Sequence, residues 1–126
     1  MSLISMDSQV FCETIHTYFR YLEQADLAKV LTLFGEEGKV YSPVYGVKEI
    51  EPFYRGLFHD TEKSVISIHA IMANLNDPYH LSARFSYQWK RVDQPAVTFE
   101  GVDLFSFTKE GKISQLEIIY DTSVLE

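Results

Sequence analysis

The sequence has little cysteine and little positive charge, and each shortage excludes a class of protein. A single cysteine, Cys12, leaves no internal disulfide and no cysteine-ligated metal site. Lysine and arginine number 11 against 18 acidic residues, and this net charge of −7, with no basic cluster, argues against a nucleic-acid partner. The longest apolar runs are too short to span a bilayer, and Met1–Asp7 lacks the basic start and long apolar stretch of a signal peptide. We therefore expect a cytoplasmic protein that binds neither nucleic acid nor membranes.

What the sequence does hold is an ordinary globular composition with many aromatic side chains. The chain has 126 residues, of which 46% are hydrophobic and 23% charged, and this predicts a single domain over residues 1–126 with its own core. Aromatic residues make up 14%, including nine phenylalanines and eight tyrosines. That proportion suits a large core or an aromatic-lined pocket. No internal repeat, low-complexity segment or linker divides the chain.

The most informative stretch is 101–108, Gly-Val-Asp-Leu-Phe-Ser-Phe-Thr, which reads as a β-strand. Alternation puts Asp103 on one face with phenylalanines and leaves Val102 and Leu104 on the other. Because both faces are apolar, we expect this strand to be covered on both sides. A buried carboxyl group there either has a hydrogen-bond partner or holds its proton through a raised pKa.

The first half of the chain predicts three helices and a short strand. The first helix is expected to begin at a cap at Asp7 or Ser8 and to run to about Gln24. Its apolar side chains fall at helical spacing, and this pattern turns the side chain of Tyr18 inward. The remaining expected elements are a helix from Asp26 to Phe34 ended by Gly35 and Gly38, a strand over 39–42 stopped by Pro43, and a helix over 47–58.

The second half predicts four long strands joined by tight turns. Leu81 to Lys90 alternates apolar and polar side chains throughout. The other strands are expected over 64–75, 97–108 and 113–121, with turn residues at 76–79, 93–95 and 109–112. This order favours an α+β fold, in which the helices pack on the concave face of a curved antiparallel sheet and enclose a cone-shaped cavity.

Several local motifs carry a resemblance to a known family. They are the tyrosine-rich helix ending in Gln24-Ala-Asp26, the Ser42-Pro-Val-Tyr-Gly46 turn, Phe53-Tyr-Arg55, and Val102–Phe107 followed by Gly111-Lys-Ile113. Over about Val10 to Asp121 the chain resembles the nuclear transport factor 2-like superfamily, which includes SnoaL-type polyketide cyclases and ketosteroid isomerases. The resemblance implies a cone-shaped, cystatin-like fold, a small hydrophobic ligand, and a homodimer formed through the outer face of the sheet. We expect no cofactor and no metal.

The resemblance to ketosteroid isomerase implies roles for three polar residues. In that family a tyrosine of the first helix and a protonated aspartic acid of a central strand bind the substrate oxygen, and a second tyrosine supports the first. Tyr18 and Asp103 match the first two positions, and Tyr54 matches the third. The alternative interpretation is a structural hydrogen bond that braces the helix against the sheet. The candidates for ligand contact are Ser42, Phe53, Phe105 and Tyr120.

Ser42 departs from the isomerase pattern. The isomerases carry their general base at this place, as an aspartate directly before a proline, and a serine hydroxyl does not take a proton at neutral pH as a carboxylate does. His69, if it faces the cavity, and Asp121, which matches the acid of SnoaL-type cyclases, are the candidates to replace it. Each also has a simpler interpretation: His69 as a hydrogen-bonded histidine of the sheet, and Asp121 as an exposed acid at a strand end.

Other catalytic classes have less support. No pair among the four histidines has the spacing of a metal site, and no Gly-x-Ser-x-Gly turn presents a nucleophilic serine. Two functions stay open, an isomerase- or cyclase-type enzyme acting on an apolar carbonyl compound, and a non-catalytic domain for ligand binding or dimeric assembly. Retention of Tyr18 and Asp103 favours the enzyme, and loss of the base at Ser42 favours the binding domain.

Overall fold

The structure is a computed structural model that describes residues 6–125. Of the N-terminal stretch considered above for a signal peptide, residues 1–5 lie outside the described part. The elements follow in the order α1 (Met6–Gln24), α2 (Leu27–Leu31), β1 (Phe34–Ser42), β2 (Gly46–Glu49), α3 (Ile50–Asp60), β3 (Thr61–Ala73), β4 (His80–Arg91), β5 (Val97–Phe107), β6 (Ile113–Tyr120) and a 3₁₀ helix η1 (Thr122–Leu125).

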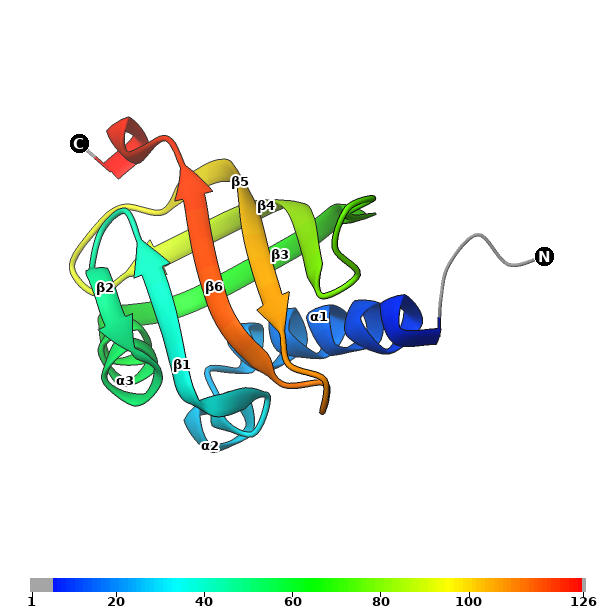
Figure 1. Ribbon diagram of the computed structural model, residues 1–126. Helices are drawn as coiled ribbons and strands as arrows, with labels where there is room; N and C mark the ends of the chain where they lie inside the picture. The colour runs from blue at the N-terminus through cyan, green and yellow to red at the C-terminus, as the bar shows by residue number, and fades with distance from the viewer. Residues whose placement is uncertain (1–5, 126) are drawn as a thin grey trace.

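Six strands form one twisted sheet in the order β2-β1-β6-β5-β4-β3 (Figure 1). Neighbouring strands are antiparallel except for β1 and β6, which run parallel with Val40 beside Leu116. The prediction of an antiparallel sheet is therefore wrong at this one pair. Parallel neighbours need a long connection, and here α3 and the other strands supply it.

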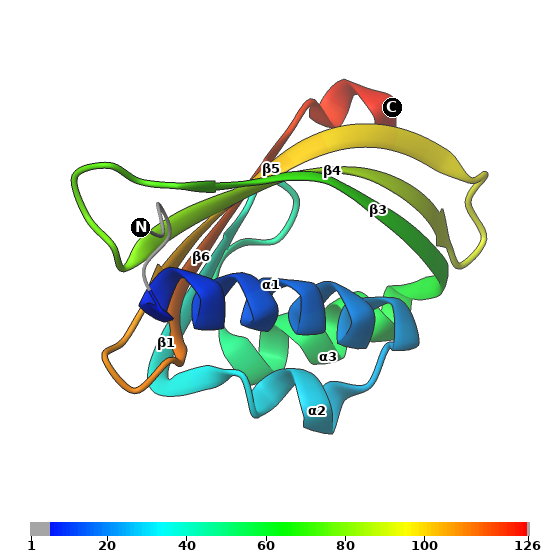
Figure 2. The same ribbon diagram turned by 90° about the vertical axis from the view of Figure 1, so that its right-hand side faces the viewer.

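The helices lie together on the concave side of the sheet, as predicted (Figure 2). The apolar stripe of α1 faces the sheet, and Ile15 and Tyr18 are only 0% and 1% exposed. This arrangement of one helical layer over one curved sheet is the predicted α+β fold. Burial of the aromatic side chains between the two layers supplies most of its apolar stabilisation.

The second helix is shorter than predicted. Asp26 caps it by accepting a hydrogen bond from the backbone N–H of Lys29, but α2 ends at Leu31 and the chain enters β1 at Phe34. Gly38 therefore lies inside a strand. A Cβ atom at this position would stand 3.1 Å from Cγ1 of Ile50, so the close packing of α3 against β1 requires a glycine.

Two helices begin elsewhere than predicted. α1 begins at Met6, so Asp7 and Ser8 lie within its first turn. α3 begins at Ile50, because Val47 and Lys48 belong to β2, a short edge strand that the sequence reading missed. None of the helices in residues 6–125 combines the length and the hydropathy that a membrane-spanning segment needs.

The central strand β5 is covered on one face only. Its inward side chains are buried, with Asp103 at 2% and Phe105 at 1% exposed. On the outward face Val102 is half-buried and Leu104 is 40% exposed. The prediction that both faces are covered is wrong for the single chain, because all three helices lie on the concave side.

Candidate functional site

A narrow cavity lies between α1, α3 and the concave face of the sheet. Its enclosed volume is about 50 Å³, and the free space is about 490 Å³ when the part open to solvent is included. Apolar and aromatic side chains form most of its wall, and the polar groups that reach it come from a few tyrosines, Ser42 and Asp103. Ligand pockets commonly have volumes of about 300–1,000 Å³. A ligand of ordinary size must therefore occupy the open part or displace side chains.

Asp103 is the one carboxylic acid among the described residues that line this cavity. It lies in register with Ala83 of β4 and Ile118 of β6, so apolar side chains flank its carboxyl group on both sides. Its Oδ1 atom is buried and has no hydrogen-bond partner among the described residues. Burial raises the pKa of Asp103 well above its ordinary value of 3.8. Burial therefore favours the protonated form of this group, which can donate a hydrogen bond.

Tyr18 supplies a second hydroxyl group at the cavity, and Tyr54 supports it from behind. Their hydroxyl oxygens lie 2.7 Å apart, and either one can be the donor. Tyr18 lines the cavity, whereas Tyr54 is fully buried beside it, in α3. If Tyr54 donates to Tyr18, the proton of Tyr18 is free to point at a ligand. Burial raises the pKa of both tyrosines well above the ordinary value of 10.0, so both remain neutral donors.

Ser42 lines the cavity, but its oxygen already has a structural role. The Oγ atom accepts hydrogen bonds from the backbone N–H groups of Val44 and Tyr45, each at 3.2 Å. These two bonds hold the turn between β1 and β2. Both lone pairs of the hydroxyl are thus occupied, so Ser42 can donate to a ligand but is poorly placed to take up a proton.

An aromatic wall on β4, β5 and β6 completes the inner part. Tyr87 stacks on Phe99 at a centroid distance of 5.3 Å, and Phe99 stacks on Tyr120 at 4.2 Å. The Tyr87 hydroxyl is hydrogen-bonded to Ser64 at 2.8 Å, and burial raises the pKa of Tyr87 to about 12. Each of these rings presents an apolar surface at neutral pH.

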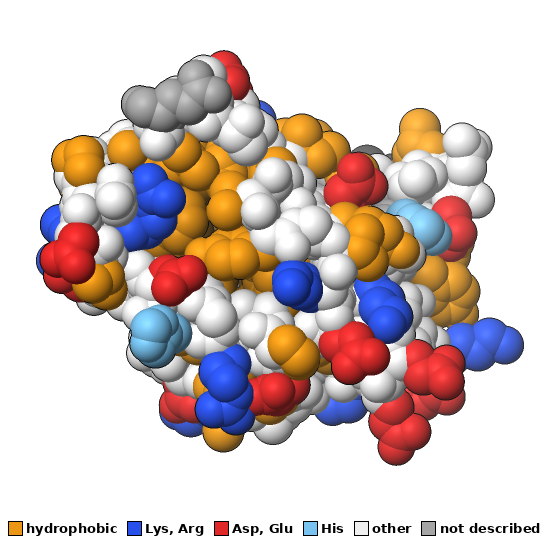
Figure 3. All heavy atoms as spheres, turned by 90° about the vertical axis from the view of Figure 1, so that its left-hand side faces the viewer, with side chains coloured by type: hydrophobic (Ala, Val, Ile, Leu, Met, Phe, Trp, Pro, Cys, Tyr) orange, Lys and Arg blue, Asp and Glu red, His pale blue; other side chains and the backbone are white. Residues whose placement is uncertain are grey.

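Two half-buried tyrosines, Tyr45 and Tyr120, mark the open end of the cavity. The Tyr45 hydroxyl donates to Oδ2 of Asp60 at 2.9 Å, and burial raises the pKa of Tyr120 to about 12. Figure 3 shows the end of the molecule that carries α3, where hydrophobic side chains form a hollow with basic and acidic side chains at its edge. An apolar ligand can enter here and still meet charged groups at the rim.

Five of the candidate residues from the sequence line the cavity together: Tyr18, Ser42, Phe53, Asp103 and Tyr120. Phe105 does not, because it packs edge-on against Tyr18 in the core at a centroid distance of 5.6 Å. Tyr54 does not line the cavity but contacts two residues that do, Tyr18 through the hydroxyl hydrogen bond and Phe53 through a ring contact at 4.7 Å.

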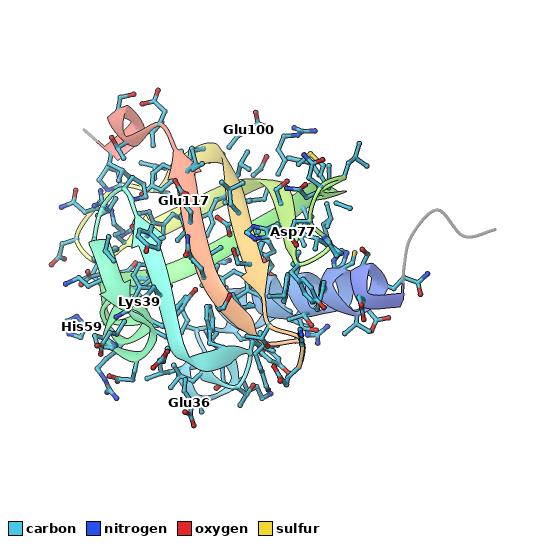
Figure 4. All side chains as sticks on the ribbon, viewed as in Figure 1. Glu36, Lys39, His59, Asp77, Glu100 and Glu117 are labelled. Carbon is cyan, nitrogen blue, oxygen red and sulfur yellow. The ribbon has the colours of Figure 1, made fainter. Side chains whose placement is uncertain are left out.

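His69 lies outside the site, contrary to its proposed role as a base. His69 continues the outward alternation of Val65 and Ser67 along β3, so its imidazole lies on the convex face. There it is hydrogen-bonded to Ser86, and its Nε2 atom lies 3.8 Å from Oε1 of Glu100. Figure 4 shows Glu100 at the outer margin of the sheet. His69 is therefore a hydrogen-bonded histidine of the outer surface.

Asp121 also lies outside the cavity. It directly follows β6 and is exposed, and its carboxylate accepts a hydrogen bond from the backbone N–H of Ser123 at 3.0 Å. That hydrogen bond lowers the pKa of Asp121 below its ordinary value. An ionised, solvated acid at this place is not positioned to act on a ligand in the cavity.

Sequence reasoning missed three residues of β4. Tyr87 and Trp89 line the cavity, and Arg91 follows them on the same face of the strand. The alternation over 81–90 already contained the signal, but ending the strand at Lys90 excluded Arg91. Within residues 6–125, no group of three or more His, Cys, Asp or Glu side chains is arranged to hold a metal ion.

The fold and the site define a small α+β domain with one apolar, acid-containing cavity. The model of the SnoaL-like domain family matches residues 15–116, and the chain belongs to this family. Among curated proteins, none matches the chain in sequence.

Solved structures of the same fold include proteins that act on or bind small molecules. SalBIII, an epoxide hydrolase/cyclase-like enzyme of pyran ring formation in the polyether salinomycin, is 21% identical with a TM-score of 0.82, over 95% of this chain and 97% of that one. A candidate SnoaL-like polyketide cyclase from Jannaschia sp. CCS1 is 11% identical with a TM-score of 0.83, over 99% and 94%. TerC, co-crystallised with polyporic acid, is 13% identical with a TM-score of 0.78, over 92% and 95%. At these identities the similarity shows a shared fold.

Proposed function

We propose that this chain binds an apolar small molecule by a carbonyl or enol oxygen, with Tyr18 and Asp103 as the hydrogen-bond donors. The buried Oδ1 of Asp103, which has no hydrogen-bond partner within residues 6–125, is the observation that carries the proposal. An unsatisfied polar atom in a protein interior costs stability, and such atoms are rare without a functional reason. A ligand oxygen in the cavity would satisfy it.

A donor pair of this kind suits isomerisation or cyclisation, because both reactions develop negative charge on an oxygen. Membership of the SnoaL-like family and the ring-forming activity named for SalBIII support this class. The described cavity wall holds no second carboxyl group and no histidine. In a cyclisation, Asp103 would therefore give its proton to the accepting oxygen and, as a carboxylate, take the proton of the attacking hydroxyl.

A non-catalytic ligand-binding domain is the second candidate function. Its support is the state of Ser42, whose oxygen accepts two backbone hydrogen bonds where an isomerase holds its base. Such a domain would use the same donors and the same aromatic wall, and it would differ from the enzyme only in lacking turnover.

Binding of 2-naphthol, compared with naphthalene, tests the donor pair, since the two probes differ by one hydroxyl group. Fluorescence titration is expected to give at least about tenfold tighter binding of 2-naphthol, and Tyr18→Phe and Asp103→Asn should each remove most of that preference. The exposed Tyr41→Phe and Asp93→Asn are matched controls and should leave both affinities unchanged. Equal binding of the two probes by the wild-type protein would overturn the proposal.

We also propose that the chain forms a homodimer through the convex face of the sheet. The support is a set of outward apolar side chains on three strands of that face, each about two-fifths or more exposed: Val65 and Met72 of β3, Leu104 of β5 and Ile119 of β6. Sedimentation equilibrium should give a dimer for the wild type and a monomer for Leu104→Glu, while naphthol binding is retained. A wild-type monomer at micromolar concentration would contradict this assembly.

A further inference from the structure

Arg91 is the last side chain of the inward face of β4. Alternation along this strand turns Phe85, Tyr87 and Trp89 toward the cavity, and all three are buried. Arg91 occupies the next inward position and is half-buried. Arg91 does not itself line the cavity, but its charge acts on Tyr45 and Tyr120, which do, so the apolar stripe of β4 ends in a guanidinium group beside these two tyrosines.

The guanidinium group of Arg91 is held in place but has no anionic partner. Its Cζ atom lies 5.1 Å from the centre of the Trp89 ring, a cation–π geometry that fixes the side chain. Its Nε atom is buried and has no hydrogen-bond partner in the described part of the chain, where no carboxylate lies within ion-pair distance of the guanidinium group either. A positioned arginine without an acceptor is rare in a protein that carries a net charge of −7.

The groups around Arg91 leave it available to an incoming ligand. Its positive charge acts on the hydroxyls of Tyr45 and Tyr120, the two half-buried tyrosines of the open end. Asp60, whose backbone oxygen accepts a hydrogen bond from the N–H of Val92, uses its carboxylate to accept a hydrogen bond from Tyr45. On the opposite face of the strand, the neighbouring Lys90 pairs with Glu62 at 3.2 Å. Asp60 and Glu62 thus have other partners.

We infer that Arg91 binds the carboxylate of the ligand, so that the natural ligand is an apolar carboxylic acid with a carbonyl or enol oxygen at its far end. This inference rests on the proposed function, because it assigns the inner oxygen to Tyr18 and Asp103. A planar guanidinium group matches a carboxylate with two parallel hydrogen bonds. The apolar body of the ligand then lies along the aromatic wall between the two polar ends.

The probe pair that tests this inference is 6-(4-hydroxyphenyl)hexanoate and its methyl ester, which share the phenol and the apolar chain. Calorimetric titration of the wild type is expected to show at least about tenfold tighter binding of the acid, and the difference should shrink in high salt. Arg91→Gln should abolish the difference and leave ester binding unchanged. Arg84→Gln, which removes an arginine from the convex face of the same strand, should change neither affinity. Thermal melts of each variant check that the fold is intact.

Each outcome separates this inference from the proposed function. Equal binding of acid and ester, or an acid preference that survives in Arg91→Gln, overturns the role of Arg91 and leaves the donor pair standing. Failure of both phenols to bind overturns the donor pair, and the role of Arg91 falls with it. If Arg84→Gln also loses the preference for the acid over the ester, the preference arises from the overall charge of the protein and not from a contact with Arg91. This result would also overturn the role of Arg91.

Discussion

The hydroxyl oxygens of Tyr18 and Tyr54 lie 2.7 Å apart, and only Tyr18 reaches the cavity. Tyr54 thus fixes the orientation of a ligand-facing donor without touching the ligand. Because Tyr18 belongs to α1 and Tyr54 to α3, this hydrogen bond holds the two helices together and also orients the hydroxyl group that faces the cavity.

Tyr54→Phe should weaken ligand binding and stability together. Loss of the buried hydrogen bond is expected to lower the free energy of unfolding by about 1 kcal/mol and, by freeing the Tyr18 hydroxyl to rotate, to weaken 2-naphthol binding about threefold to tenfold. Chemical denaturation and fluorescence titration measure the two effects, with Tyr41→Phe as the control. Unchanged naphthol affinity would show that Tyr54 has a structural role only.

Gly101 sets the width of the cavity near Asp103. A Cβ atom there would lie 2.8 Å from Cζ of Phe85, a ring of the cavity wall. Gly101→Ala should therefore push Phe85 aside and cost about 1–3 kcal/mol of unfolding free energy, with weaker naphthol binding. Gly56→Ala is the control, because its Cβ meets nothing within 4 Å and α3 should become slightly more stable. Equal stability of Gly101→Ala and the wild type would contradict this packing.

The sequence predicts the fold well because helical and strand periodicities are local properties of the chain. The stripe of α1 and the alternation of β4 were both correct, whereas Gly35 and Gly38 were misread as the end of a helix. Their actual role depends on a contact of Gly38 with Ile50 of α3, which no local pattern contains. The short strand β2 was missed for the same reason, since its pairing with β1 is a tertiary feature.

The site was predicted in part. Alternation, helical spacing and the family resemblance together pointed to Tyr18 and Asp103, and both line the cavity. Alternation alone left the face of His69 open, because it does not say which set of alternate positions points inward, and in the structure His69 shares the outward face with Ser67. The occupied hydroxyl of Ser42 and the open-end position of Arg91 depend on turn geometry and on where a strand ends, and both are poorly determined by sequence.

Ser42→Asp tests whether a base at this position completes an active site. An aspartate can keep the backbone hydrogen bonds of the turn with one oxygen and take a proton with the other. We expect isomerisation of 3-cyclohexenone, a small β,γ-unsaturated ketone, to rise at least about tenfold above that of Ser42→Asn. Ultraviolet absorbance of the conjugated product measures the rate. A variant that binds 2-naphthol but does not isomerise the ketone would show that the cavity holds its ligand in another orientation.

Asp103 should make stability depend on pH in a characteristic direction. The native carboxyl group keeps its proton at pH values where the unfolded one has lost it, so the native state binds more protons. The contribution of Asp103 to the free energy of unfolding is then fully present below about pH 4 and is lost as the pH rises through the native pKa. Asp103→Asn has no carboxyl group to titrate at this position. Its free energy of unfolding, measured by chemical denaturation at pH 4, 5.5 and 7, should therefore increase relative to that of the wild type as the pH rises. A difference that is independent of pH would contradict a raised pKa.

The most direct test of the central claim is the protonation state of Asp103 itself. The ¹³C chemical shift of its carboxyl carbon, assigned by comparison with Asp103→Asn, can be followed between pH 3 and pH 9 with and without 2-naphthol. The account predicts a protonated carboxyl group at pH 7 in the free protein, and a further change in its shift when the naphthol oxygen binds. A carboxylate already ionised at pH 5, or a shift that does not respond to saturating naphthol, would contradict the account.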